Sequence, residues 1–121
     1  IIEASQKKQN TVCFVVENQE NLLGYLIVSR SSEKKKSHNA YLVMGVLAAH
    51  TRLGLGKRLL ATAEEWARNN NVIRLELQVF ALNSNAINFY KHMGFVIEGT
   101  KRQAICIDGV YQDEFLMVKF L

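Results

Sequence analysis

The stretch that decides the fold is AYLVMGVLAAHTRLGLGKRLLATAEEWARNN, residues 40–70. Its first nine residues, 40–48, are almost continuously apolar, which is typical of a strand buried on both faces. Gly54 and Gly56 follow, and residues 56–69 then carry apolar side chains at spacings of three and four, as an amphipathic helix does. The sequence therefore predicts a buried strand, a glycine turn and a helix in direct succession.

The remaining apolar runs predict a mixed sheet with helices packed on it. The other predicted elements are strands at 12–16, 22–30 and 72–80 and a helix at 84–92. Residues 95–98 start a further strand, and the chain closes as a hairpin within 102–120. Ser84 or Asn85 can cap the second helix, and Gly94 can end it. Asp108-Gly109 is the favoured pair for a tight turn. The predicted order is β-β-β-α-β-α-β-β, an α/β or α+β fold in one domain over residues 1–121.

Composition narrows the class of protein. A length of 121 residues allows one domain, and an apolar fraction of 49% is enough for a hydrophobic core. No apolar run approaches the roughly 20 residues that cross a bilayer, and the first ten residues do not resemble a signal peptide. The net charge of +4 suits a small anionic ligand as well as nucleic acid. Because Cys13 and Cys106 lie far apart without a CxxC motif, we interpret them as reduced core residues of a cytoplasmic protein.

The turn at residues 52–58 is a candidate anion site. Glycine lets backbone amides approach a ligand, and the first amides of a helix are unpaired and carry partial positive charge. Phosphate or pyrophosphate suits such a turn. Thr51 and Arg58 exclude a Walker A loop, and Leu59 excludes a dinucleotide fingerprint. A tight turn whose glycines serve packing alone remains the alternative.

A second segment, NSNAINFYKHMGF at residues 83–95, completes a resemblance to the GNAT superfamily of acetyl-CoA-dependent N-acetyltransferases. In that family a strand ending in Val leads into [Arg/Gln]-x-x-Gly-x-[Gly/Ala] and a helix, which here are Val46 and then TRLGLG at 51–56. The family's second signature is matched by Asn83, Ala86, Tyr90 and Gly94-Phe95. The resemblance covers most of the chain, about residues 12–120.

The sequence departs from the family pattern in two places. Thr51 stands where Arg or Gln is usual, with Arg52 beside it as a substitute phosphate contact. The family's first strand and first two helices, which form one wall of the acceptor pocket, are not found at the N-terminus. Either the sequence given is incomplete at its start or the pocket is more open. The resemblance otherwise implies a mostly antiparallel sheet with a splayed central strand pair and helices on both faces.

The resemblance implies that acetyl-CoA binds at the glycine turn and along the strand before it. The pantetheine arm would pair with the backbone of residues 42–47, much as an added strand would. The backbone amides of residues 53–58 would hold the pyrophosphate. The implied cofactor-binding residues are Val46, Leu47, Arg52, Leu53, Gly54, Leu55, Gly56, Lys57, Arg58, Asn83 and Tyr90. The Asn83 side chain would contact either the pantetheine arm or the helix start.

Two catalytic residues are expected, Tyr90 and Glu76. The resemblance gives Tyr90 the role of donor to the departing thiolate, since a phenol with a pKa near 10 is protonated at neutral pH. The alternative is a core aromatic residue of a short helix. Glu76 is the best acidic candidate for the base, because a carboxylate is rarely found within a buried strand unless it is paired or has a function. The alternative for Glu76 is an ordinary paired strand residue. The proton would then be accepted by His38 or by a water chain without a dedicated base.

The predicted function is transfer of an acetyl group from acetyl-CoA directly to a primary amine of a small molecule or of a protein or peptide. A non-catalytic CoA-binding sensor or scaffold is the alternative. The tail from Glu98 to Glu114 is similar to the branch with ribosomal-protein N-terminal and polyamine acetyltransferases, and Tyr111 and Glu114 would line the acceptor side. We expect no metal, no nucleic-acid partner and no membrane partner, and a homodimer is left open.

Overall fold

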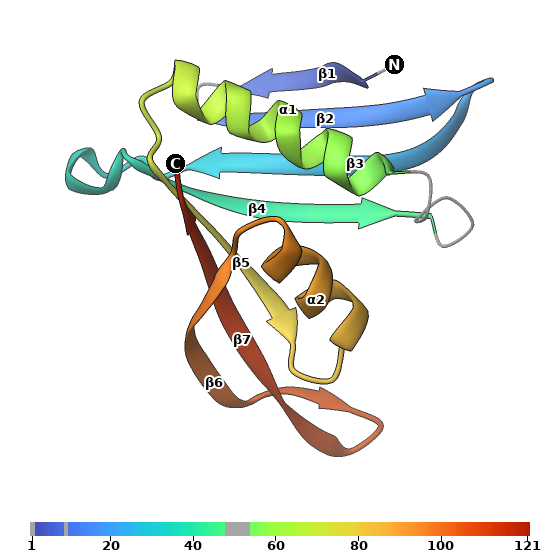
Figure 1. Cartoon of the computed structure of the whole chain (residues 1–121), viewed down its shortest axis with the longest axis vertical. Helices are drawn as coiled ribbons and strands as arrows, with labels where there is room; N and C mark the ends of the chain where they lie inside the picture. Colours follow the sequence, from blue (N-terminus) through green and yellow to red (C-terminus); the bar gives the residue numbers. More distant parts are fainter. Residues whose placement is uncertain (1, 9, 48–53) are drawn as a thin grey trace. The chain divides into compact units, whose positions relative to one another are not determined.

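The computed structural model describes residues 2–8, 10–47 and 54–121, which divide into two compact units. The first unit runs to Leu75 and includes the last residue, Leu121, and the second spans Glu76–Phe120. The first contains β1 (Ile2–Lys8), β2 (Thr11–Asn18), β3 (Asn21–Arg30), the 3-10 helix η1 (Lys34–Lys36), β4 (Asn39–Val46) and α1 (Leu55–Asn69) (Figure 1). Strand β5 (Arg74–Phe80) leads into the second, which adds α2 (Ser84–His92), β6 (Val96–Ile107) and β7 (Val110–Phe120).

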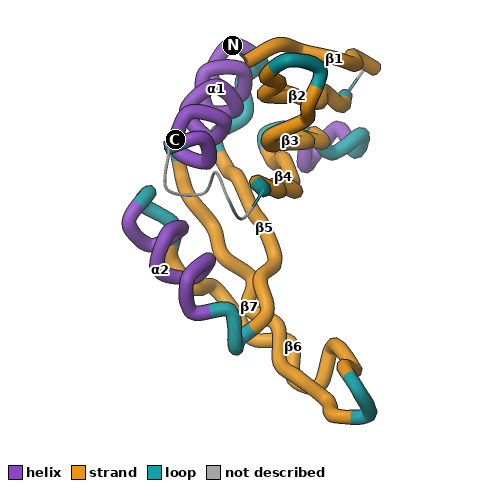
Figure 2. The backbone as a smooth tube through the Cα atoms, turned by 90° about the vertical axis from the view of Figure 1, so that its right-hand side faces the viewer, coloured by secondary structure: helices purple, strands orange, loops and turns teal. Residues whose placement is uncertain are grey.

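The first unit is an antiparallel sheet in the order β1-β2-β3-β4 with α1 on one side of it (Figure 2). Alternate residues of the strands are buried, and the register makes them cross-strand partners on one face, since Val12 lies opposite Val28 and Phe14 opposite Leu26. The buried residues of α1 include Leu59, Leu60, Ala63 and Ala67. Period-two strands and a period-3.6 helix therefore build the core that supports the start of α1.

Gly24 on β3 lets α1 approach the sheet closely. A Cβ atom at this position would lie 3.3 Å from Leu59 Cδ1 and 3.2 Å from the Gly45 carbonyl oxygen. Those distances are tighter than ordinary van der Waals contacts, so any larger residue would push the first turns of α1 away from β3. The end of α1 that carries the glycine turn is thus placed by packing against a strand.

The first unit corrects two predictions from the sequence. Strand β1 was not predicted, because residues 3–8 are mostly polar, and it forms by pairing with β2 from Ile2↔Val16 to Lys8↔Thr11. Strand β4 was expected to be buried on both faces, but Val43 is 43% exposed. Since α1 covers only the face that carries Ala40 and Leu42, an apolar run alone did not reveal the exposed side.

The second unit orders its strands β5-β7-β6 and packs Leu77, Val79, Ile87, Phe95, Met117 and Val118 into its core. Asp108 and Gly109 have φ of 51° and 78°, so the predicted two-residue turn is confirmed. Cys106 on β6 is exposed and Cys13 on β2 is half-buried, so the prediction of two core cysteines is wrong. Strand β6 is exposed along most of its length, so the apolar residues around Cys106 wrongly predicted that it is buried.

Apart from β1, the predicted order of strands and helices is confirmed, and so is the mixed, mostly antiparallel fold class. The predicted helices at 56–69 and 84–92 correspond to α1 and α2. In the parts of the chain that the structure describes, neither helix is long and apolar enough to cross a membrane.

Candidate functional site

The start of α1 has the properties of an anion site. Gly54, the N-cap, has φ 74° and ψ 15°, a left-handed conformation that glycine adopts without strain. No side chain in the described part of the chain caps this end, and no acidic residue lies in its first turn. The side chains of Lys57 and Arg58 are exposed there. The amides of the first turn and two cations are therefore presented together.

The structure divides the predicted cofactor residues into four groups, of which Asn83 and Tyr90, at the start of α2 and within it, are described below. Arg52 and Leu53, with Thr51, lie outside the described residues. Val46 ends β4, and the Leu47 amide donates to the Leu23 carbonyl at 2.9 Å, while the Leu47 side chain is 52% exposed. The residues from Gly54 to Arg58 form the start of α1.

One detail of the expected phosphate contacts changes. The Arg58 amide donates to the Gly54 carbonyl at 3.1 Å, the first hydrogen bond of the helix. Because this amide already donates within the helix, Arg58 can contact an anion only through its side chain. The amides that precede it in the first turn have no partner within the helix.

Helix α2 carries Tyr90 and is capped at its start by Asn83. The Asn83 side-chain oxygen accepts a hydrogen bond from the Ala86 amide at 3.2 Å. The sequence prediction placed the cap at Ser84 or Asn85, which is wrong by one residue or two. It also assigned Asn83 a side-chain contact to either the pantetheine arm or the helix start, and the contact to the helix start is confirmed. Such a short polar run offers three candidate caps, and the backbone geometry selects among them.

The other end of α2 is a Schellman motif, and Tyr90 is part of it. The Phe95 amide donates to the Tyr90 carbonyl at 2.9 Å, and the Gly94 amide donates to the Lys91 carbonyl at 3.0 Å. Gly94 has φ 97°, so the predicted glycine stop is confirmed. The Tyr90 ring meets the Phe95 ring edge to face, with centroids 5.6 Å apart, and meets Phe89 at 5.3 Å. Backbone and ring contacts both fix Tyr90.

Burial raises the pKa of the Tyr90 hydroxyl above its usual value of 10.0. The phenol is therefore protonated throughout the neutral and mildly alkaline range. In this state it donates a hydrogen bond, and it is not a base at neutral pH.

Glu76 lies on β5 on the same face as Gln78, as predicted, while the alternate residues Leu75, Leu77 and Val79 are buried. Both Glu76 and Gln78 are partly buried. With the Gln78 amide oriented to satisfy its neighbours, its nitrogen donates to Glu114 Oε1 at 2.8 Å. Its oxygen accepts from Lys101 Nζ at 2.7 Å. Glu114 was predicted from the sequence to line the acceptor side, whereas Lys101, which lies opposite Glu114 on β6, was missed.

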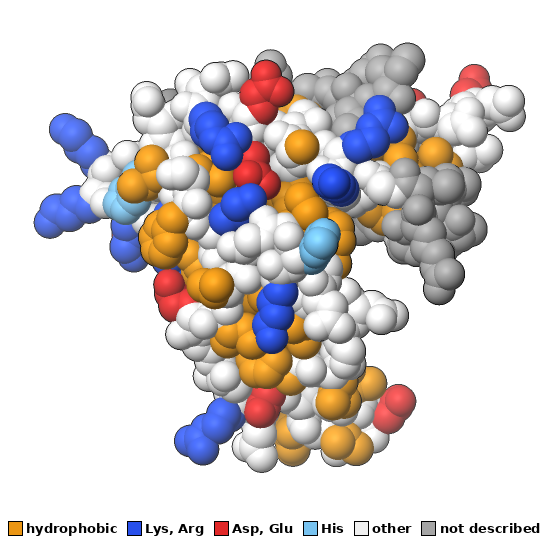
Figure 3. Space-filling view, in the orientation of Figure 1, with side chains coloured by type: hydrophobic (Ala, Val, Ile, Leu, Met, Phe, Trp, Pro, Cys, Tyr) orange, Lys and Arg blue, Asp and Glu red, His pale blue; other side chains and the backbone are white. Residues whose placement is uncertain are grey.

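The remaining candidates lie at exposed positions. His38 is exposed in the loop before β4, and its carbonyl oxygen accepts hydrogen bonds from the amides of Ile73 and Arg74. Tyr111 is 65% exposed beside the apolar end of the β6–β7 hairpin, visible in orange in Figure 3. Among the described residues, no group of three or more side chains is arranged to hold a metal ion.

Comparison with known proteins gives consistent results. The profile described as Acetyltransferase (GNAT) family matches residues 2–95. The L-amino acid N-acetyltransferase AaaT of Escherichia coli (strain K12) is 29% identical over 103 residues, which are 82% of this chain and 62% of that protein. A solved acetyltransferase of the GNAT family from Streptococcus pneumoniae has a TM-score of 0.87 at 28% identity, covering 94% of this chain and 69% of that one.

A second solved structure, the ribosomal-protein-alanine N-acetyltransferase from Brucella melitensis, has a TM-score of 0.81 at 27% identity, covering 92% of this chain and 69% of that one. The chain spans less than two thirds of the length of the curated relatives, 62% of one and 52% of another. The family profile nevertheless includes both the glycine turn and α2 with Tyr90. The chain therefore belongs to the GNAT family of acetyltransferases.

Proposed function

We propose that this chain is an acetyl-CoA-dependent N-acetyltransferase that transfers the acetyl group directly to a primary amine of a small molecule or of a protein or peptide. The observation that carries the proposal is Tyr90, a protonated, half-buried phenol held by the Schellman motif of α2. The family uses acetyl-CoA as its cosubstrate.

In the proposed reaction the amine nitrogen attacks the thioester carbonyl carbon. A C–N bond forms, the C–S bond breaks, and the amine loses a proton while negative charge develops on sulfur. A thiol has a pKa of about 8.5, well below that of a tyrosine whose pKa is raised above 10. Full proton transfer from Tyr90 to the thiolate is therefore uphill. We assign Tyr90 a hydrogen bond that stabilises the developing charge.

Acetyl-CoA is proposed to bind through its pyrophosphate at the start of α1. The first-turn amides and the side chains of Lys57 and Arg58 would meet the phosphates, with Arg52 and Leu53 as further predicted contacts. Val46 and Leu47 would pair with the pantetheine arm. Because the Asn83 oxygen is used in the helix cap, we assign its amide nitrogen to the pantetheine contact.

Glu76 is proposed as the base that accepts the amine proton, directly or through water. A lysine-like amine with a pKa of about 10.4 costs roughly 4 kcal/mol to deprotonate at neutral pH, so a nearby acceptor has a large effect on rate. The partly buried position of Glu76 on β5 supports this role. The proposed location is the cytoplasm, because both cysteines are free thiols and Cys106 is exposed.

The test is thiol release from acetyl-CoA across a panel of L-amino acids, polyamines, alanine-terminated peptides and aminoglycosides. We expect turnover with at least one class, and loss of it without loss of acetyl-CoA binding in Tyr90→Phe. Calorimetry would measure the binding separately. Binding without turnover in a broad panel would instead favour a CoA-binding sensor or scaffold.

A further inference from the structure

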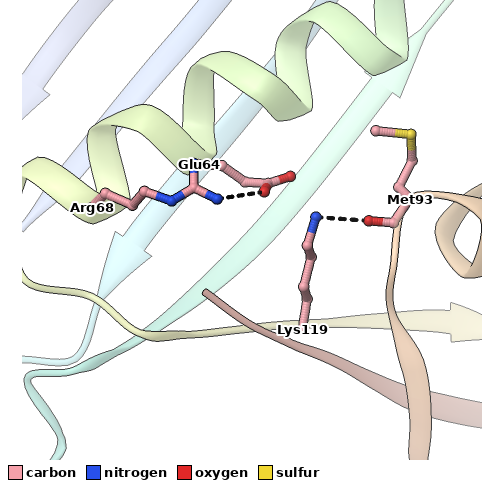
Figure 4. A network of polar contacts seen from close by, with 4 residues as sticks. All are labelled: Glu64, Arg68, Met93 and Lys119. Carbon is pink, nitrogen blue, oxygen red and sulfur yellow. Dashed lines mark hydrogen bonds and ion pairs between the residues drawn. The ribbon is translucent and has the colours of Figure 1, made fainter.

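Lys119 on β7 is bonded to the end of the helix that carries Tyr90. Its Nζ donates to the Met93 carbonyl oxygen at 2.8 Å, and Met93 is the C-cap of α2 (Figure 4). The two residues before Lys119 on the strand, Met117 and Val118, are fully buried. The ammonium group is therefore carried by a firmly packed strand, within the same compact unit as the helix.

This bond adds a third capping contact to the helix end. The last carbonyl groups of a helix have no partner within it, and the end carries partial negative charge. The Schellman hydrogen bonds occupy the carbonyls of Tyr90 and Lys91, and Lys119 occupies that of Met93 with a charged donor. Three consecutive amides, those of Met93, Gly94 and Phe95, bond back to the last two turns. A displacement of Met93 is therefore passed to Tyr90.

Helix α2 depends on such caps more than a long helix would. It has nine residues, of which only Ile87 is buried. Isolated helices of this length are unstable in water, so burial and capping must hold it together. The side chain of Lys119 also lies against Gly94, where a Cβ atom would come within 3.2 Å of Lys119 Cε.

We propose that Lys119 is a positioning residue that fixes the Tyr90 hydroxyl by holding the C-terminal end of α2. The inference rests on the proposed role of Tyr90 at the leaving sulfur. It adds a residue from outside the two sequence signatures, 24 positions beyond Phe95, the last residue of the second signature. The effect of this residue on turnover passes through Tyr90.

The kinetic test compares Lys119→Met with Lys119→Arg, which keeps the charge and the donors. Lys91→Met is the matched control, because Lys91 is an exposed lysine in the same last turn. We expect Lys119→Met to lower kcat roughly 10- to 100-fold, the scale of a misplaced catalytic group, with the KM for acetyl-CoA within about twofold. Lys119→Arg should stay within about threefold of wild type, and Lys91→Met within about twofold.

A double-mutant cycle separates an effect through Tyr90 from a general loss of structure. In a Tyr90→Phe background, Lys119→Met should lower kcat by less than about twofold further, because the group that it positions is already missing. An equal fall in both backgrounds would overturn the proposal. Circular dichroism confirms the fold. If Lys119→Met does not fold, it is replaced by Lys119→Gln, which removes the charge and shortens the side chain but keeps it polar.

A spectroscopic test needs no turnover. Fluorine NMR of protein labelled with 3-fluorotyrosine gives a Tyr90 resonance, assigned by its loss in Tyr90→Phe. Lys119→Met should shift or broaden this resonance while that of the exposed Tyr111 is unchanged. An unchanged Tyr90 resonance would overturn the proposal. If Tyr90→Phe turns over normally, the catalytic role of Tyr90 fails, and the fluorine signal still decides whether Lys119 positions the ring.

Discussion

Replacing Gly94 with alanine is expected to destabilise the protein by about 2–4 kcal/mol. The φ of 97° at Gly94 is one that a residue with a Cβ atom rarely adopts, and such backbone strain costs about 1–3 kcal/mol. The new methyl group would also lie 3.2 Å from Lys119 Cε and 3.4 Å from Nζ. Lys119 is flexible, but moving it stretches its bond to Met93, which adds up to about 1.5 kcal/mol.

The measurement is urea unfolding followed by circular dichroism, with thermal unfolding beside it. For a domain of this size, each kcal/mol shifts Tm by roughly 3–5 °C, so the fall should be about 6–20 °C. Gly109→Ala is the comparison for backbone strain alone, because Gly109 has φ 78° and nothing lies within 4 Å of its Cβ position. We expect Gly109→Ala to cost about 1–2 kcal/mol.

The contact with Lys119 is isolated by repeating Gly94→Ala in a Lys119→Ala background. With the side chain removed, the cost should fall by about 0.5–1.5 kcal/mol and approach that of the backbone term alone. If Gly94→Ala costs the same in both backgrounds, Lys119 does not pack against Gly94 in the way described. If it costs less than about 0.5 kcal/mol in either, the left-handed C-cap is refuted as well.

Four further outcomes are expected. Glu20→Gly should stabilise the protein by about 1 kcal/mol in urea unfolding, because Glu20 has φ 68° in the β2–β3 turn. Arg58→Glu should weaken acetyl-CoA binding by calorimetry about tenfold or more, with a smaller difference at high salt. Glu76→Gln should lower kcat/KM about 10²-fold near pH 7, and less at high pH, where the amine deprotonates unaided. Tyr90→Phe should lower kcat and kcat/KM together by roughly 10- to 10³-fold. Since burial raises the pKa of Tyr90 above 10, its ionisation should not limit the rate between about pH 7 and 9.

The features that were predicted from the sequence depend on neighbouring residues. Local backbone preferences, which can be read from a single sequence, determine three of them. These are the Asp108-Gly109 turn, the left-handed Gly94 and the bounds of α2. The alternation of Leu75, Leu77 and Val79 with Glu76 follows from the period of a strand. Such features need no knowledge of the partner strand.

The features that were missed depend on pairing between distant segments. Counting back from the Asp108-Gly109 turn would place Gln103 opposite Glu114, but the register shifts between Lys101 and Ile105, so Lys101 lies there instead. The shift is held by Asp113, whose carboxylate accepts a hydrogen bond from the Gln103 amide at 2.9 Å. Gln103 takes the positive φ of 53° that such a bulge requires. No single segment of the sequence predicts this register, so Lys101 could not be placed beside Gln78 and Glu114.

The second signature of the chain acquires a physical meaning from the helix end that it builds. In Tyr-x-x-x-Gly-Phe, the glycine supplies the left-handed residue, and the phenylalanine supplies both the amide that closes the motif on Tyr90 and the ring against which Tyr90 packs. Phe95 is 1% exposed, so that ring is anchored in the core. Gly94 and Phe95 thus both hold Tyr90 in place. A substitution at either should lower turnover by displacing the hydroxyl, even though neither side chain carries a group that could react.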